Sequence, residues 1–121
     1  MLNKVILIGR LTDVADLRYT QNGTPVATFD LAVNRPTVGQ DGKREADFFR
    51  VVCWNKLAEN VSQYTGKGSL VAVVGRLQTR KYQAKDGTNR TAYEVVADSV
   101  EFLDHRKPED AANAGQDVPI I

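Results

Sequence analysis

Few residues of this chain have side chains that could carry out catalysis. His105 is the only imidazole, and it stands where the periodic pattern of the chain ends. Cys53 alternates with Phe49 and Val51, so a strand would turn its thiol into the core beside them. One cysteine can form neither an internal disulfide nor a zinc site. The residues that most often act as nucleophile or base are therefore poorly placed for that chemistry.

The sequence also gives little support for a phosphate-binding loop or for a set of catalytic carboxylates. The segment Gly66–Ser69 resembles the end of a phosphate-binding loop, but Val61 replaces the first glycine and Gly68 replaces the required Ser or Thr. The carboxylates are scattered over separate segments, where solvated or turn roles are expected for them: Asp13, Asp16, Asp30 and Asp47. We therefore expect no enzyme, no cofactor and no metal site.

The most informative segment is 47–54, which would present two aromatic rings and a cation on one face of a strand. Phe48, Arg50, Val52 and Trp54 share that face, opposite the core-facing residues. At roughly 3.3 Å per residue, the two rings stand about 20 Å apart, enough to span several unstacked nucleotides. Alternatively, the rings pack under a neighbouring loop while Arg50 reaches water.

A second segment repeats this composition. Along 76–82, the residues Arg76, Gln78, Arg80 and Tyr82 share a face. Bases of single-stranded nucleic acid stack on aromatic rings at about 1–3 kcal/mol each, while Arg and Lys follow the phosphates. The two segments therefore predict a single-strand binding surface. A protein–protein interface, which is also rich in Trp, Tyr and Arg, is the alternative.

Length and charge limit the classes of protein that the chain can belong to. Its 121 residues fit one domain, and its 16 Lys+Arg against 15 Asp+Glu give a formal charge of +1. Residues 1–103 carry 14 basic and 11 acidic residues, whereas residues 104–121 carry 2 and 4. Phosphate neutralisation alone would therefore bind a polyanion weakly, so stacking must contribute.

No targeting segment or membrane span is evident. The chain lacks an apolar run of about 18–20 residues, and its start lacks the long apolar region of a signal peptide. We expect a cytoplasmic protein with no membrane partner and no small-molecule substrate.

Alternation with period two predicts an all-β fold. Alternating segments at 5–11 and 27–34 and apolar-rich runs at 47–54, 69–83 and 91–103 are separated by the turn pairs Asn22-Gly23, Asp41-Gly42 and Asp86-Gly87. A short helix is expected over 56–64, capped by Asn55 and ended by Gly66 and Gly68. This order predicts a small β-barrel with one short helix and a long hairpin. We expect a domain at 1–103 and a disordered, mildly acidic tail at 104–121.

At this level of detail the chain resembles the bacterial and phage single-stranded DNA-binding proteins, the SSB family, over residues 1–103. Matches to the family pattern occur in order at Asn3–Leu11, Leu17–Tyr19, Asn22-Gly23, Phe48–Trp54, Lys56–Glu59, Lys67–Ser69, Gly75–Leu77, Thr79–Tyr82 and Thr91–Val96. The resemblance implies an oligonucleotide-binding (OB) fold, a five-stranded Greek-key barrel. It also implies a homotetramer with single-stranded DNA wrapped over it.

The resemblance also implies roles for individual residues. The base-stacking aromatics of the family fall on Phe48, Trp54 and Tyr82, which alternation selects independently. Phosphate contacts implied by the resemblance are Arg10, Arg50, Lys56, Arg80, Lys81 and Arg90, and the alternation along 76–82 adds Arg76. Arg18 and Lys67, although at matching positions, are expected to be ordinary surface cations.

Two departures from the family pattern stand out. The segment Arg35–Val38 lacks the aromatic residue that many members have there. The tail ends in Asp117, Val118, Pro119, Ile120 and Ile121 in place of an acidic cluster followed by Ile-Pro-Phe. The tail is therefore either a site for replication, recombination and repair proteins or an inert solubilising end.

These observations predict sequence-independent binding and protection of single-stranded DNA in replication, recombination and repair. The alternative is an OB-fold subunit of a replication or repair complex whose aromatic face contacts another protein.

Overall fold

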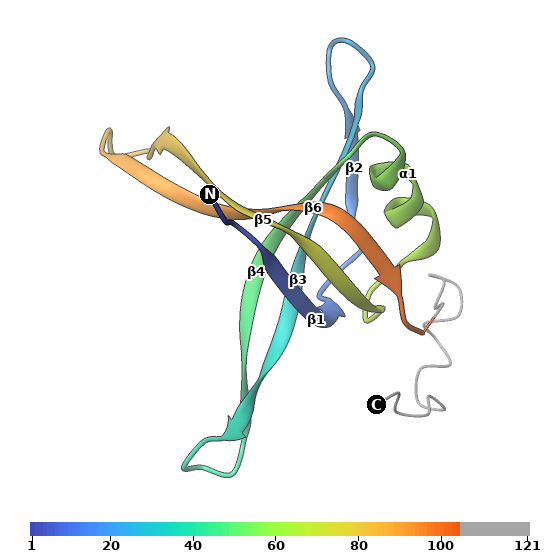
Figure 1. The fold of residues 1–121 in the computed structure, drawn as a ribbon. Coiled ribbons are helices and arrows are strands. Elements are labelled where there is room, and N and C mark those ends of the chain that lie inside the picture. The colour runs from blue at the N-terminus through green and yellow to red at the C-terminus, as the bar shows by residue number, and fades with distance from the viewer. Residues whose placement is uncertain (105–121) are drawn as a thin grey trace.

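The computed structural model describes residues 1–104, which form six strands and one helix (Figure 1). In chain order, the elements are β1 (Val5–Leu11), β2 (Asp16–Tyr19), β3 (Pro25–Val38), β4 (Arg44–Trp54), α1 (Asn55–Tyr64), β5 (Leu70–Gln83) and β6 (Asn89–Phe102). The predicted all-β class with one short helix is confirmed. Within this part of the chain, no helix has the length and apolar character needed to cross a membrane.

Five of the strands close into a barrel, as predicted. Their order is β1-β5-β6-β4-β3, and β1 closes the ring by pairing with β3 as well as with β5. All of these pairings are antiparallel except that between β4 and β6, which is parallel. Strand β2 pairs only with β3, and α1 packs mainly on β3. The chain therefore brings β4 beside β6 although the helix and β5 separate them in sequence.

The core consists of the side chains that alternation turns inward. Its fully buried members include Leu31, Val51, Cys53, Val71 and Val73. Helix α1 adds Ala58 and Val61 to the same cluster. The predicted burial of Cys53 is confirmed, and burial raises the pKa of its thiol to about 12.

Two glycines permit the tight closure of the barrel. A Cβ atom at Gly9 would overlap the carbonyl oxygen of Ala32, where β3 crosses β1. A Cβ atom at Gly75 would overlap the carbonyl oxygen of Val96, beside the register shift between β5 and β6. Any larger residue would push the strand pairs apart at these two positions.

Three hairpins extend from the barrel (Figure 1). Their turns contain Gly23, Gly42 and Gly87 with φ angles of 82°, 80° and 86°, so the three predicted turns are confirmed. The β3–β4 hairpin is longer than the pattern predicts, because β3 continues beyond Asn34 to Val38. A register shift between Asn34 and Val38 accommodates Pro36, which has no N–H to donate to a partner strand.

The predicted helix is confirmed to within one residue at its start and ends at Tyr64 as expected, but the predicted capping residues are wrong. Asn55 does not cap the helix: it is the first helical residue, with φ of 61°, and no side-chain hydrogen bond caps this end. At the other end, the backbone N–H and the hydroxyl of Thr65 both donate to the Val61 carbonyl, at 3.1 and 2.6 Å. Thr65 is extended, with φ of −124°, so the helix stops before either glycine.

Candidate nucleic-acid interface

Strand order brings the two aromatic and basic segments together on one surface. Strand β6 lies between β4 and β5. Val52 on β4 is in register with Val96 on β6, and Tyr82 on β5 is in register with Arg90 on β6. Because paired residues point to the same face of a sheet, alternation along each strand places these side chains on the same face of the sheet. We call it the outer sheet face, formed by Phe48, Arg50, Trp54, Arg76, Arg80, Tyr82 and Arg90.

The three aromatic rings of the outer sheet face are open to solvent. Phe48 is 67% exposed, Trp54 42% and Tyr82 41%. Neither ring of β4 is sealed beneath a neighbouring loop, the alternative left open by the sequence. A planar ligand can therefore reach part of each ring.

Val52 shares the face of Arg50 and Trp54, as alternation predicts, but it is covered. This side chain points outward with Arg50 and Trp54 but is only 8% exposed. Thr28 of β3 and Val96 of β6 flank it in register and cover it. Val52 therefore forms an apolar floor between the two rings of β4 instead of a contact surface.

Every arginine predicted to contact phosphate already lies against a carboxylate. The ion pairs are Arg10–Asp104 at 3.3 Å, Arg50–Asp30 at 3.8 Å, Arg76–Asp98 at 3.9 Å, Arg80–Glu94 at 3.4 Å and Arg90–Asp86 at 3.6 Å. Lys56, which follows Trp54 at the start of α1, is exposed and forms no ion pair within residues 1–104, and the same holds for Lys81.

Besides Lys56 on α1, two of the predicted cations do not belong to the outer sheet face. Arg10 lies opposite Leu70, at the other end of β5 from Tyr82, and its guanidinium also donates to the Gly68 carbonyl at 2.9 Å. Lys81 alternates with Tyr82 and so points to the other face of the β5–β6 hairpin. Arg18 is highly exposed, and within residues 1–104 its one ion pair is with Asp16, at 3.1 Å.

The tip of the β5–β6 hairpin holds a groove of about 480 Å³ lined by Lys81, Tyr82, Gln83, Asn89, Arg90 and Thr91. Asp86 lies in the adjoining turn, where the hydroxyl and the backbone N–H of Thr88 donate to it at 2.6 and 3.0 Å. These hydrogen bonds lower the pKa of Asp86, so it remains a carboxylate beside Arg90.

Sequence reasoning missed a cluster of charges on the β3–β4 hairpin. Arg35 donates to Asp47 at 2.9 Å and to Glu45 at 2.8 Å. The hydrogen bond from Arg35 lowers the pKa of Asp47, and the same pair raises the pKa of Arg35. The sequence does contain a sign of this ion pair, because Arg35 and Asp47 lie at equal distances along the chain on either side of the turn residue Asp41. This cluster occupies the segment that lacks the expected aromatic.

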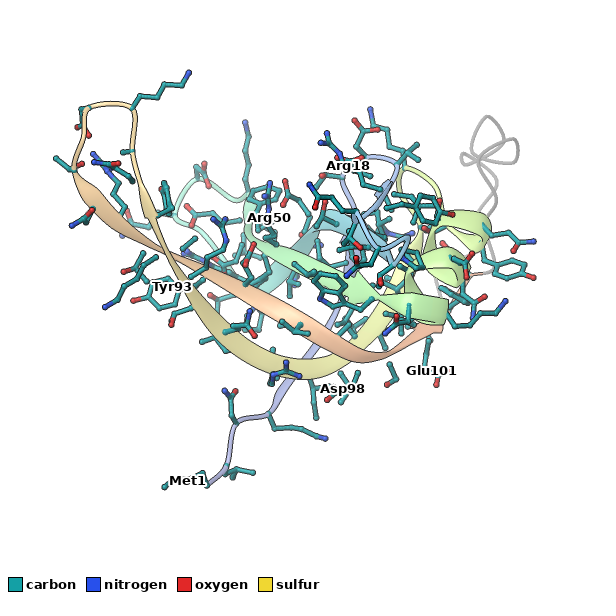
Figure 2. All side chains as sticks on the ribbon, turned by 90° about the horizontal axis from the view of Figure 1, so that it is seen from above. Met1, Arg18, Arg50, Tyr93, Asp98 and Glu101 are labelled. Atoms are coloured by element: carbon teal, nitrogen blue, oxygen red, sulfur yellow. The ribbon has the colours of Figure 1, made fainter. Side chains whose placement is uncertain are left out.

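Tyr93 is a second residue that the sequence reasoning did not select. It is 64% exposed and lies on the β5–β6 hairpin (Figure 2). Because Tyr93 pairs with Thr79, it points to the face opposite Tyr82. Exposure alone therefore does not place an aromatic ring on the outer sheet face.

Three of the acids expected to be scattered line one small hollow. Asp13, Asp16 and Asp30 border it together with Arg50, in a volume of about 180 Å³. Within the described part of the chain, no group of three or more His, Cys, Asp or Glu side chains is arranged to hold a metal ion. His105 and the tail residues Asp117, Val118, Pro119, Ile120 and Ile121 lie outside the described residues.

Comparisons with known proteins all indicate one family. The model of the Single-strand binding protein family matches residues 2–103. Proteins named "Single-stranded DNA-binding protein" from Bacillus cereus and Oceanobacillus iheyensis are 58% and 52% identical over 106 and 117 residues, which are 88% and 97% of this chain. "Single-stranded DNA-binding protein 2" of Staphylococcus aureus is 57% identical over 104 residues. The chain spans 62% of the length of the Bacillus cereus protein, and 70% and 74% of the other two.

Proposed function

Because the chain belongs to the single-strand binding protein family, we propose that it binds single-stranded DNA without sequence preference and protects it during replication, recombination and repair. The observation that carries this proposal is the outer sheet face, where Phe48, Trp54 and Tyr82 are exposed among cations. No catalytic step is part of the function, and no cofactor is needed for it.

Base stacking supplies most of the affinity in this proposal. Each of the three rings offers a flat apolar surface, and a stacked base contributes about 1–3 kcal/mol whatever its identity. Stacking does not read the hydrogen-bonding edges of bases, so little sequence preference follows. The low formal charge of +1 agrees with a mechanism that does not rely on charge alone.

The cations around the rings attract the phosphate backbone electrostatically. Arg50, Arg76, Arg80 and Arg90 surround the rings on the outer sheet face, and Lys56 adjoins Trp54. Lys81 and Arg10 lie at the margins of this surface. Double-stranded DNA keeps its bases paired and stacked, so it can use the cations but not the rings, and it should bind more weakly.

We also propose that the chain assembles as a homotetramer. Strand β1 pairs with β5 from Val5 to Arg10 but with β3 only at Arg10 and Leu11, so one edge of Val5–Gly9 has no partner strand within residues 1–104. Ile6 and Ile8 beside this edge are 67% and 49% exposed. An open edge flanked by apolar side chains is a surface onto which the same strand of a second copy can pair.

We propose two functional parts along the chain. Residues 1–103 act as the DNA-binding domain, to which Arg10 and the Leu70 N–H hold Asp104. The tail that Asp104 begins, residues 104–121, is the segment through which replication, recombination or repair proteins bind. The protein works in the cytoplasm, where its DNA substrate lies.

A fluorescence titration tests the proposed function. Trp54 is the only tryptophan, so intrinsic emission reports on this site alone. Adding oligo-dT at low salt should quench the emission saturably, and raising the salt should weaken binding moderately without abolishing it. No quenching, or a response that salt removes entirely, would contradict stacking and favour a protein-binding role for this face.

A further inference from the structure

The arginines near the proposed DNA path fall into two classes, according to the burial of their acidic partners. Asp30, Asp98 and Asp86 have side chains that are 52–58% exposed. Glu94 and Asp104 have side chains that are only 10–11% exposed. The corresponding arginines are all about half exposed, so the difference lies in the acids.

We propose, building on single-stranded DNA binding as the function, that Arg50, Arg76 and Arg90 exchange their carboxylates for phosphate, whereas Glu94 retains Arg80 as a positioning residue for the Tyr82 ring. The proposal therefore assigns Arg80 a contact with an aromatic ring in place of a contact with the DNA backbone. The burial of Glu94 is the reason for this assignment.

Arg50, Arg76 and Arg90 can exchange their partners because exposed ions cost little free energy to separate. The Arg50–Asp30 and Arg76–Asp98 pairs are long, at 3.8 and 3.9 Å, and both partners are hydrated. Exposed pairs of this kind contribute little to stability. When phosphate takes the guanidinium, the freed carboxylate remains in water, so the exchange leaves no buried charge without a partner.

Arg80 is retained because its acidic partner, Glu94, is buried instead of exposed. This carboxylate lies on the outer sheet face in register with Gln78, and it is nearly buried. Removing Arg80 would leave a desolvated negative charge without its ion-pair partner, which costs far more than separating exposed ions. Phosphate would also approach that charge closely. Arg80 is therefore the guanidinium of the outer sheet face that DNA is least able to capture.

The retained Arg80 guanidinium lies close to the ring of Tyr82. Its Cζ atom lies 5.6 Å from the centroid of the Tyr82 ring, within the range of a cation–π contact. Glu94 holds the same guanidinium, with its Oε1 atom 3.4 Å from Nε of Arg80. This arrangement fixes the orientation of Tyr82 before DNA arrives and leaves its opposite ring face for a base.

Arg10 belongs to the same retained class for a structural reason. Its partner Asp104 also accepts a hydrogen bond from the backbone N–H of Leu70, at 3.1 Å, and Arg10 donates to the Gly68 carbonyl. Arg10 therefore ties β1 to the start of β5 and the end of β6. We expect no phosphate contact from it.

Salt dependence separates the two classes. For single strands, the slope of log affinity against log salt concentration changes by about 0.7 for each phosphate contact. We expect Arg76→Gln to make the slope shallower by about 0.7, and Arg80→Gln to leave it unchanged while weakening binding through the ring. Glu94→Gln should free Arg80 to reach phosphate and make the slope steeper by about 0.7. A purely structural role for Glu94 predicts no such gain.

Glu101→Gln is the matched control for Glu94→Gln, because it removes the same charge from the same strand. Glu101 is exposed and forms no ion pair within residues 1–104 (Figure 2). Circular dichroism should first show that each variant is folded. If Arg80→Gln lowers the slope as much as Arg76→Gln, or if Glu94→Gln does not exceed the control, the division into two classes is wrong. Wild-type protein that fails to bind oligo-dT would overturn the proposed function as well.

Discussion

Replacing Phe48 with alanine tests the stacking mechanism directly, because it removes a ring while keeping Trp54 as the fluorescent reporter. Phe48 is the most exposed of the three rings on the outer sheet face, at 67%. Its loss should therefore remove a contact with DNA and little of the packing within the protein. We expect weaker binding of oligo-dT with an almost unchanged fold.

The two effects can be estimated separately. One stacked base is worth about 1–3 kcal/mol, so the affinity should fall about 5- to 150-fold. A fully buried aromatic side chain covers about 150–250 Å², so the buried third of Phe48 stabilises the fold by at most about 1–2 kcal/mol. A domain of this size has about 5–15 kcal/mol of stability, so the variant should remain folded at 25 °C.

The assay is the Trp54 titration with oligo-dT, performed beside a urea unfolding curve for each protein. Tyr93→Ala is the matched control, since Tyr93 is 64% exposed but lies on the opposite face of the β5–β6 hairpin. The control should bind like the wild type. Normal binding by a folded Phe48→Ala protein, or an equal loss in the control, would refute the assignment of the rings to the DNA path.

Other substitutions test the phosphate contacts, the open edge of β1 and the burial of Cys53. Lys56→Gln should make the salt slope of oligo-dT binding shallower by about 0.7 without reducing the maximal quenching of Trp54, because an unpaired cation contributes charge and no stacking. Ile6→Asp should lower the mass measured by light scattering from four chains to one or two, and an unchanged mass would argue against pairing at the β1 edge. Cys53 should resist thiol reagents in the native state, and its burial makes stability depend on pH. The pKa of its thiol is raised from an ordinary 9.0 to about 12, so between these pH values the thiol ionises only in the unfolded chain. The free energy of unfolding should therefore fall by about 1.4 kcal/mol per pH unit in this range. Urea unfolding should show that this contribution is missing from Cys53→Ala.

Much of the fold could be predicted from local pattern. The inward positions of β3 and β4 alternate strictly, and Phe29, Leu31, Val51 and Cys53 are all buried as the alternation requires. Glycine at a positive φ marks the three hairpin turns, because few other residues adopt that conformation without strain. These signals depend on neighbours in sequence, so a single sequence contains them.

Other features left no local signal. Beyond Asn34, both faces of the β3–β4 hairpin are exposed, so the apolar alternation that reveals a strand disappears although the strand continues. Strand β2 has only four residues, too few for a pattern. Asn55 has the composition of a cap, but the chain leaves β4 in a left-handed conformation at this residue, and so Asn55 cannot serve as one.

For the candidate site, the sequence by itself determined which side chains leave each strand on the same side, because the backbone of a strand turns successive residues to opposite faces. Phe48 and Trp54 on β4, and Tyr82 on β5, were identified in this way. Only the tertiary structure decided that β6 lies between these strands, that Val52 and Glu94 are outward yet covered, and that one edge of β1 is open. The physical reason is that direction is a property of one strand, whereas burial and pairing depend on neighbours that come from distant parts of the chain.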